Sequence, residues 1–566
     1  MQEFDDKKQD DRLSFLRKKE EEDLIKILSD KYGIPYIDLS TVSIEGDALK
    51  IISEEKARAA EIAPFQLINK KAFIAVRSPD RNDTKIALEE ISSKGYFPTL
   101  FITSTASLER VWGRYKEVSF ASESKSGLLD VSAEFLNEAF EKIKTIPDIT
   151  NMVNDVLSKT GGHKISVMLE ILLAGSVAVG ASDIHIEPED ENVHIRARLD
   201  GVLENLLTIN YETYKLLSSR IKLLSGLKLN VKASAQDGRF SIKLNEKEIE
   251  IRSSVIPGAY GESFVMRVLN PENIAVPFEE LGVNKYLFEI IEKELKRPNG
   301  IILTTGPTGS GKTTTLYAFL RKIYSPGNKM ITIEDPIEYH LEGITQTQTN
   351  EEKGYTFLEG LRSALRQDPD VIMVGEIRDT ETAKIAINSA LTGHLVFSTL
   401  HTNTAAGAIP RLIDLGVDAK IISSALNVSL AQRLARKLCS SCKKESPATD
   451  DEKRILTAVV ERIKEEKKEY ALEPIESLLP VTNLFQPVGC EKCNNTGFKG
   501  RVGIYEAILT DENIEKAITE NPTERELKKA SLSQRILDLQ EDATIKIIQG
   551  ITSLSEVSRV VDLEEV

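Results

Sequence analysis

The sequence predicts an α/β protein whose central part is a nucleotide-binding domain of the P-loop class. Three observations indicate this fold. A glycine-rich stretch at residues 306–313 lies between an apolar run and a segment of helical character. Two later apolar runs end in carboxylates, as strands do at the ligand-binding edge of a parallel sheet. The chain has 566 residues, 41% of them hydrophobic, which allows several domains with cores of their own.

The N-terminal region reads as a compact α/β domain, which we place at residues 1–120. Residues 23–32 have helical character, and the glycine and proline that follow end this helix. The apolar run 72–76 is typical of a strand. A serine-rich stretch then predicts a linker over residues 121–150.

A second domain is expected at residues 151–275, where helices mix with alternating strands such as 193–199 and 248–252. The most apolar run, 165–181, has 17 residues and contains Glu170. It is shorter than the roughly 20 residues that cross a bilayer. We therefore expect a buried helix and not a membrane span.

The nucleotide site is predicted from residues 306–313, which read GPTGSGKT and fit G-x-x-x-x-G-K-[ST] in full. Glycines let backbone N–H groups surround a phosphate, and the N-terminus of the following helix adds partial positive charge. Lys312 is expected to reach the β- and γ-phosphates, and the Thr313 hydroxyl to hold Mg²⁺. The residues expected to bind ATP are Gly306, Pro307, Thr308, Gly309, Ser310, Gly311, Lys312, Thr313 and Thr314.

Polar groups end the next three predicted strands. The strand 330–334 ends in Glu334, and the strand 371–374 is followed by Glu376. Carboxylates at such an edge bind Mg²⁺ or activate water, although a solvated strand end is the alternative for each. We expect Glu334 to activate water and Glu376 to bind Mg²⁺, with the two roles interchangeable. His401 follows a further strand and is expected to sense the γ-phosphate, although a structural role is equally compatible with its position.

The four cysteines form two Cys-x-x-Cys pairs with 47 residues between them. In an intracellular chain this pattern favours a metal over disulfides, and four thiolates suit tetrahedral Zn²⁺. The separation is longer than in a compact zinc ribbon, so free buried thiols are the alternative. The predicted zinc ligands are Cys439, Cys442, Cys490 and Cys493.

The charge balance bears on partners and location. The chain has 73 basic and 88 acidic residues, a formal net charge of −15, which disfavours a nucleic-acid partner. Residues 1–22 are charged throughout and lack an apolar segment, so we expect no secretory signal. The protein is expected to be cytoplasmic and to reach a membrane only through partners.

Four motifs in this order resemble those of the ATPases of type II secretion and type IV pili. Residues 306–313 resemble the Walker A loop of that family, 333–338 its Asp box, 368–379 its atypical Walker B motif and 392–403 its His box. The resemblance implies a RecA-like ATPase core, here placed at residues 279–510, with hydrolysis of ATP by a ring of six subunits.

The resemblance extends upstream and downstream of this core. Residues 182–188, 196–201 and 236–239 are similar to the PAS-like second N-terminal domain of the family, from which arginines reach the nucleotide. The matching residues here are Arg196, Arg198 and Arg239, with salt bridges at a domain interface as the alternative role. The cysteine pairs make 439–493 a zinc-binding insertion. A C-terminal helical segment is expected at 511–566, in which residues 542–561 resemble the closing helical segment of the family.

The first domain resembles the N-terminal domain of the same family over residues 32–39. Some members bind a cyclic dinucleotide there through an Arg-Leu-Gly motif. Residues 12–14 read Arg-Leu-Ser in this chain, so we do not predict that ligand.

Together these features predict a hexameric motor that drives type IV pilus assembly, since retraction motors of the family lack the cysteine pairs and the long N-terminal region. A type II secretion ATPase is the alternative, and a DNA-transfer ATPase or a scaffold that barely hydrolyses ATP is less favoured. The expected partners are identical subunits, an inner-membrane platform protein and associated cytoplasmic assembly proteins. The expected cofactors are ATP, Mg²⁺ and structural Zn²⁺, at the inner face of the cell membrane.

Overall fold

The computed structural model describes residues 25, 28–40, 42, 44–49, 51–68, 70–118, 133–159, 164–244, 247–270 and 276–563. Residues 12–14 and the part 121–132 of the predicted linker lie outside these ranges. The remaining part, 133–150, is not an open linker, because it contains a helix at Ala133–Lys142 and the start of another at Ile146–Ser158. The chain divides into two compact units, one of residues up to 130 with 219–229, and one of residues 131–218 with 230–566. In the part of the chain that is described, no helix has the length and apolar content needed to cross a membrane.

The first unit contains a three-stranded sheet of order β1-β2-β3, in which β2 runs antiparallel to β1 and parallel to β3. The buried Trp112 is fixed in its core, because its indole Nε1–H donates to the carbonyl of Ile62 at 2.9 Å. The predicted strand at 72–76 is β2. The elements are α2 (Gly46–Leu49), α3 (Glu54–Ala59), β1 (Ile62–Ile68), β2 (Lys71–Val76), α4 (Asn82–Ser93), β3 (Phe97–Ile102) and α5 (Thr105–Val118).

The second unit begins with helices and an antiparallel sheet of order β6-β5-β4-β9-β8-β7. The predicted apolar helix is α8, whose residues 168–177 are all buried, so the run is a core helix as expected. The elements are α6 (Ala133–Lys142), α7 (Ile146–Ser158), α8 (Lys164–Ala178), β4 (Ala181–Pro188), β5 (Val193–Leu199), β6 (Val202–Ile209), α9 (Tyr211–Leu224), β7 (Gln236–Leu244), β8 (Lys247–Gly258) and β9 (Gly261–Leu269).

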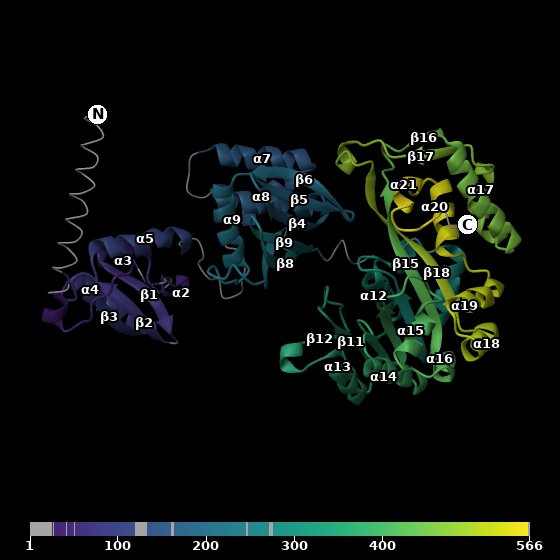
Figure 1. Ribbon diagram of the computed structural model, residues 1–566, viewed down its shortest axis with the longest axis horizontal. Coiled ribbons are helices and arrows are strands. Elements are labelled where there is room, and N and C mark those ends of the chain that lie inside the picture. The colour runs from purple at the N-terminus through teal and green to yellow at the C-terminus, as the bar shows by residue number, and fades with distance from the viewer. Residues whose placement is uncertain are drawn as a thin grey trace. The chain divides into compact units, whose positions relative to one another are not determined.

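A seven-stranded sheet of order β12-β11-β13-β14-β10-β15-β18 follows, parallel except for β18. Figure 1 labels the strands β11, β12, β15 and β18 of this sheet. Its central strands are buried throughout because one core packs α11 and α12 against them and a second core packs α13 to α16. The strands are β10 (Gly300–Thr305), β11 (Met330–Glu334), β12 (Thr345–Gln348), β13 (Val371–Val374), β14 (Leu395–Leu400), β15 (Leu426–Leu438) and β18 (Phe498–Leu509). The helices are α11 (Lys285–Glu294), α12 (Lys312–Ile323), α13 (Phe357–Ala364), α14 (Thr380–Leu391), α15 (Ala408–Asp414) and α16 (Ala419–Ala425).

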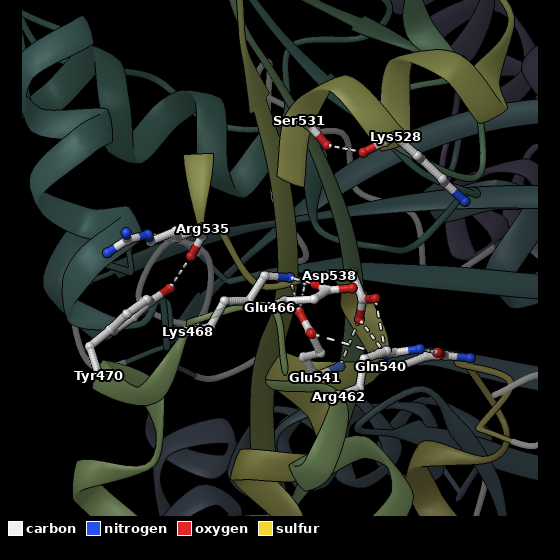
Figure 2. Close-up of polar contacts among 10 residues, drawn as sticks. All are labelled: Arg462, Glu466, Lys468, Tyr470, Lys528, Ser531, Arg535, Asp538, Gln540 and Glu541. Atoms are coloured by element: carbon white, nitrogen blue, oxygen red, sulfur yellow. Dashed lines mark hydrogen bonds and ion pairs between the residues drawn. The ribbon is translucent and has the colours of Figure 1, made fainter. Parts of the chain in front are cut away.

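An insertion between β15 and β18 packs on the last helices of the chain, and the two share one hydrophobic core. A buried ion pair and a partly exposed one join them: Lys468 lies 2.7 Å from Glu541, and Arg462 lies 3.0 Å from Asp538 (Figure 2). The insertion contains β16 (Lys444–Pro447), α17 (Asp450–Glu465) and β17 (Asn483–Gln486). The last helices are α18 (Glu512–Glu520), α19 (Glu524–Ser531), α20 (Leu539–Ile548) and α21 (Leu554–Val557).

Candidate active site

The glycine-rich loop connects β10 to α12, as the sequence predicts for a phosphate-binding loop. Gly306 (φ +144°) and Gly311 (φ +90°) have backbone angles that favour glycine. A Cβ on Gly306 would lie 2.6 Å from the carbonyl oxygen of Gln432, and one on Gly311 would lie 2.7 Å from its side-chain nitrogen. Gln432 of β15 therefore packs directly against the loop, and its Oε1 also accepts a 2.8 Å hydrogen bond from Thr315 of α12.

Lys312 begins α12, so its ammonium lies beside the loop and the N-terminus of the helix. The Lys312 Nζ donates to the carbonyls of Gly306 at 2.8 Å and Pro307 at 3.1 Å. Burial lowers the pKa of Lys312; the Glu376 carboxylate opposes this shift and the Arg433 guanidinium adds to it. Among the other predicted loop residues, Ser310 is buried, Thr314 is partly buried, and Pro307, Thr308, Gly309 and Thr313 are exposed.

Glu334 is buried at the end of β11, with 2% exposure. Its carboxylate accepts hydrogen bonds from the hydroxyls of Tyr317 and Thr332, and from the Gln346 amide at 3.1 Å. Burial raises the pKa of Glu334, while these hydrogen bonds oppose the rise. No sequence motif marked Tyr317 or Gln346, because the contact is made only when α12, β11 and β12 come together.

Glu376 and His401, which follow neighbouring strands β13 and β14, are brought together in the structure. The His401 Nε2 lies 3.2 Å from one oxygen of Glu376, and the Arg378 guanidinium lies 2.5 Å from the other. The Glu376 carboxylate opposes the lowering of the Lys312 pKa, so of the two predicted acids it is the one that acts on the phosphate-binding loop. A metal ion or a water molecule held by Glu376 would lie at this edge of the sheet.

The predicted arginines lie on the six-stranded sheet, and two of them, Arg198 and Arg239, belong to a row of charged residues that crosses five strands. The strand registers place each member of the row directly opposite the next, so their side chains leave the sheet on one face. The row holds four guanidinium groups and one carboxylate, and Arg252 also pairs with Glu250 at 3.0 Å and with Glu338 at 3.6 Å. From β5 to β7, the row is Arg198, Asp183, Arg267, Arg252 and Arg239.

Two members of the row share the buried Asp183: Arg267 donates to it at 3.2 Å, and Arg198 lies 3.7 Å away. Arg196, two residues before Arg198 on the same strand face, donates to Glu187. Arg239 is exposed. Arg252 is a member that no motif marked, although its place in the alternating stretch 248–252 puts it on the polar face of β8.

The four cysteines meet at the far ends of β15 and β18. Their sulfur atoms all lie within 4.8 Å of one another, and three of the separations are 3.9, 3.8 and 3.7 Å. Zinc–sulfur bonds of about 2.3 Å in a tetrahedron require sulfur separations of about 3.8 Å. The backbone N–H groups of Cys490 and Gly497 also donate to the Cys493 sulfur, at 3.2 and 3.3 Å. The residues fit a structural zinc site.

A family model described as "Type II/IV secretion system protein" matches residues 159–559, well over half of the chain. The chain belongs to this family. An MshEN domain model matches residues 32–119, within the first unit. The chain is therefore an ATPase, and the predicted α/β fold with a RecA-like ATPase core is confirmed. The family implies a bound nucleotide and Mg²⁺.

Individual relatives carry two kinds of name. The chain is 42% identical to "Type II secretion system protein E" of Aeromonas hydrophila over 406 residues, 72% of this chain and 77% of the relative. It is 33% identical to "Type IV pilus assembly ATPase PilB" of Myxococcus xanthus over 539 residues, 95% of this chain and 91% of the relative. The solved ATPase DotB of Legionella pneumophila shares the fold with a TM-score of 0.50 at 21% identity, covering 70% of this chain and 95% of DotB.

Proposed function

We propose that this ATPase is a hexameric motor that drives type IV pilus assembly. The observation that carries the proposal is the end-to-end match with the pilus assembly ATPase, which covers 95% of this chain. The matched type II secretion proteins of Aeromonas hydrophila and Vibrio cholerae cover 72% and 78% of it. The first domain is thus part of the resemblance to the pilus protein. The motor would act in the cytoplasm on a platform protein of the inner membrane, together with associated cytoplasmic assembly proteins.

In this proposal the residues at the edge of the seven-stranded sheet bind and hydrolyse ATP. The loop from Gly306 to Thr314 holds the phosphates, with Lys312 on the β- and γ-phosphates and Thr313 on Mg²⁺. Of the two acids, we now favour Glu376 for water activation, because Glu334 is enclosed by three donors. This assignment gives Glu376 the role that the sequence suggested for Glu334, with His401 beside Glu376 to respond to the γ-phosphate.

The arginine row supports a second part of the proposal. Guanidinium groups neutralise the charge that spreads over the transferred phosphoryl group. We propose that Arg196, Arg198 and Arg239 close on the nucleotide during turnover, and that Arg252 acts with them. Phosphate release would then open this contact and let the domains move.

Structural zinc on Cys439, Cys442, Cys490 and Cys493 is also proposed, because the sulfur separations fit a tetrahedral ion. The ion would tie the ends of β15 and β18 across the long insertion and stabilise it. It takes no part in the chemistry.

A type II secretion ATPase is the second candidate. It is favoured by the higher identity of 42% to the Aeromonas protein, against 33% for the pilus protein. A chromosomal Lys312→Ala allele in the source organism separates the two candidates. Loss of surface pili in electron micrographs with normal exoprotein release supports the pilus motor. Normal piliation with exoproteins retained in the cells supports the secretion motor and refutes our proposal.

A further inference from the structure

Arg433 lies on β15 immediately beyond the point where the phosphate-binding loop leaves the sheet. The parallel pairing of β10 with β15 ends with Thr305 opposite Ala431. Gln432, the next residue on β15, contacts both Gly306 and Gly311 of the loop. Arg433 therefore follows a residue that is in direct contact with the loop, at the edge of the sheet where ligands bind in open α/β folds.

The half-buried Arg433 guanidinium is held by carbonyl groups and not by a carboxylate. Its Nη1 donates to the carbonyl of Gln432 at 3.0 Å, and its Nη2 donates to that of Asn403, two residues after His401, at 2.9 Å. In the described part of the chain, no carboxylate lies within ion-pair distance of Arg433 or of Lys312. A guanidinium has five N–H donors, so three of them remain for another acceptor.

Arg433 and the P-loop lysine also act on each other electrostatically. The Arg433 guanidinium lowers the pKa of Lys312, and burial lowers the pKa of Arg433 itself, with Glu506 opposing. Two partly desolvated cations at the same edge of the sheet repel each other and favour an anion that contacts both. A terminal phosphate is such an anion, because it can accept from an ammonium and a guanidinium at once.

The loop that contains Asn403 has other anchors, so holding it is not the whole role of Arg433. The backbone N–H of Ala405 donates to the buried Glu506 at 2.5 Å, and the Thr404 hydroxyl donates to Glu524 at 2.7 Å. The Ser429 hydroxyl donates to the carbonyl of Ala405 at 2.9 Å. These anchors come from β18, α19 and β15, so the position of the loop is fixed without the guanidinium.

We propose that Arg433 is a phosphate-binding residue of this ATPase, which donates to the γ-phosphate of ATP together with Lys312. The guanidinium would join the phosphate-binding loop to the loop after β14 through the same phosphate, and the contact would be lost when that phosphate leaves. The inference rests on the nucleotide site proposed above, and it places one arginine of the site in the same domain as the phosphate-binding loop.

The test compares Arg433→Gln and Arg433→Lys with wild-type full-length protein. Binding of a non-hydrolysable ATP analogue and of ADP is measured by calorimetry with Mg²⁺ present. A hydrogen bond to a charged group corresponds to about a 10- to 100-fold change in affinity. We expect that loss for the ATP analogue in Arg433→Gln, with ADP affinity changed by less than about threefold, and a smaller loss in Arg433→Lys. Lys437→Gln, on the same strand but outside the site, is the control and should bind both as wild type.

Two results overturn the inference. Equal affinity of wild type and Arg433→Gln for the ATP analogue removes Arg433 from the site. Equal loss for the analogue and ADP, accompanied by a lower Tm, makes it a structural tether; if Arg433→Gln does not fold, the same comparison is made with Arg433→Lys. Lys312→Ala separates this inference from the site itself. If Lys312→Ala loses nucleotide and Arg433→Gln does not, only the inference about Arg433 fails.

Discussion

The buried ion cluster between the insertion and α20 makes Lys468 a sensitive position. The Lys468 side chain is 4% exposed, and its ammonium lies 2.7 Å from Glu541 and 2.6 Å from Glu466 (Figure 2). Glu541 is fully buried, and its other close cation is Arg462 at 3.7 Å. Replacing Lys468 with methionine keeps the length of the side chain and leaves the Glu541 carboxylate short of a partner.

Removing one partner of a buried ion pair costs about 3–5 kcal/mol, because the remaining charge stays desolvated. Glu466 is 25% exposed at its side chain and can turn to water, so we expect a cost near the lower limit, about 3 kcal/mol at pH 8. Burial raises the pKa of Glu541 to about 7; Asp538 adds to the rise and Lys468 opposes it. Without Lys468 this pKa rises further.

The sign of the pH dependence follows from that shift. The folded protein holds a proton on Glu541 more tightly than the unfolded chain, so the stability of wild type falls as pH rises through about 7. In the Lys468→Met variant the pKa of Glu541 is higher, so its carboxyl stays protonated to a higher pH than in wild type. The variant therefore loses more stability than wild type between pH 6 and pH 8. Its deficit should therefore shrink at pH 6, by about 1 kcal/mol if the pKa of Glu541 is one unit higher in the variant, and by no more than about 1.4 kcal/mol over this range of pH.

Thermal unfolding followed by differential scanning fluorimetry at pH 6 and pH 8 measures both effects. Lys453→Met is the matched control, since Lys453 lies on the surface of α17 and its partner Asp450 is fully exposed. It should change stability by less than about 0.5 kcal/mol. Equal Tm values for Lys468→Met and Lys453→Met at pH 8 would refute the reasoning, as would a Lys468→Met deficit that grows at pH 6.

Three further predictions concern the two sites. Lys312→Ala should slow ATP hydrolysis by at least about 100-fold, because the variant lacks the cation that stabilises the negative charge developing on the transferred phosphoryl group. An assay of released phosphate measures the rate, and a normal rate would contradict the assignment of the nucleotide site. Glu376→Gln should slow turnover by at least about 100-fold while ATP affinity is retained. Glu334→Gln should instead lower the free energy of unfolding by about 1–3 kcal/mol, seen as a lower Tm, because the amide N–H groups of the new glutamine face the hydrogen-bond donors that surround this position. Turnover lost in Glu334→Gln at unchanged Tm would restore Glu334 as the base. Each purified chain should contain one Zn²⁺ by atomic emission spectroscopy, and Cys442→Ser should lose both the metal and thermal stability. Wild-type protein that is purified without metal and has the same Tm after Zn²⁺ is added would exclude a structural zinc ion.

Features encoded in short stretches of sequence were predictable. The phosphate-binding loop needs glycine at defined positions and a lysine at the start of a helix, so residues 306–313 identify it without a partner elsewhere. The apolar helix α8 was predicted because a run of 17 residues with one glutamate is too short for a membrane and too apolar for a surface. The position of Glu376 after a buried strand likewise placed it at the edge of the sheet.

Contacts between distant stretches were decided only by the tertiary structure. The enclosure of Glu334 by Tyr317 and Gln346 depends on how α12 and β12 pack around β11. The place of Arg433 at the end of the strand beside the phosphate-binding loop depends on β15 pairing with β10, a contact between residues more than a hundred positions apart. Local patterns reflect backbone preferences and solvent exposure, which neighbouring residues determine. Which side chains meet depends on strand order and register, and these are set by the packing of the whole sheet.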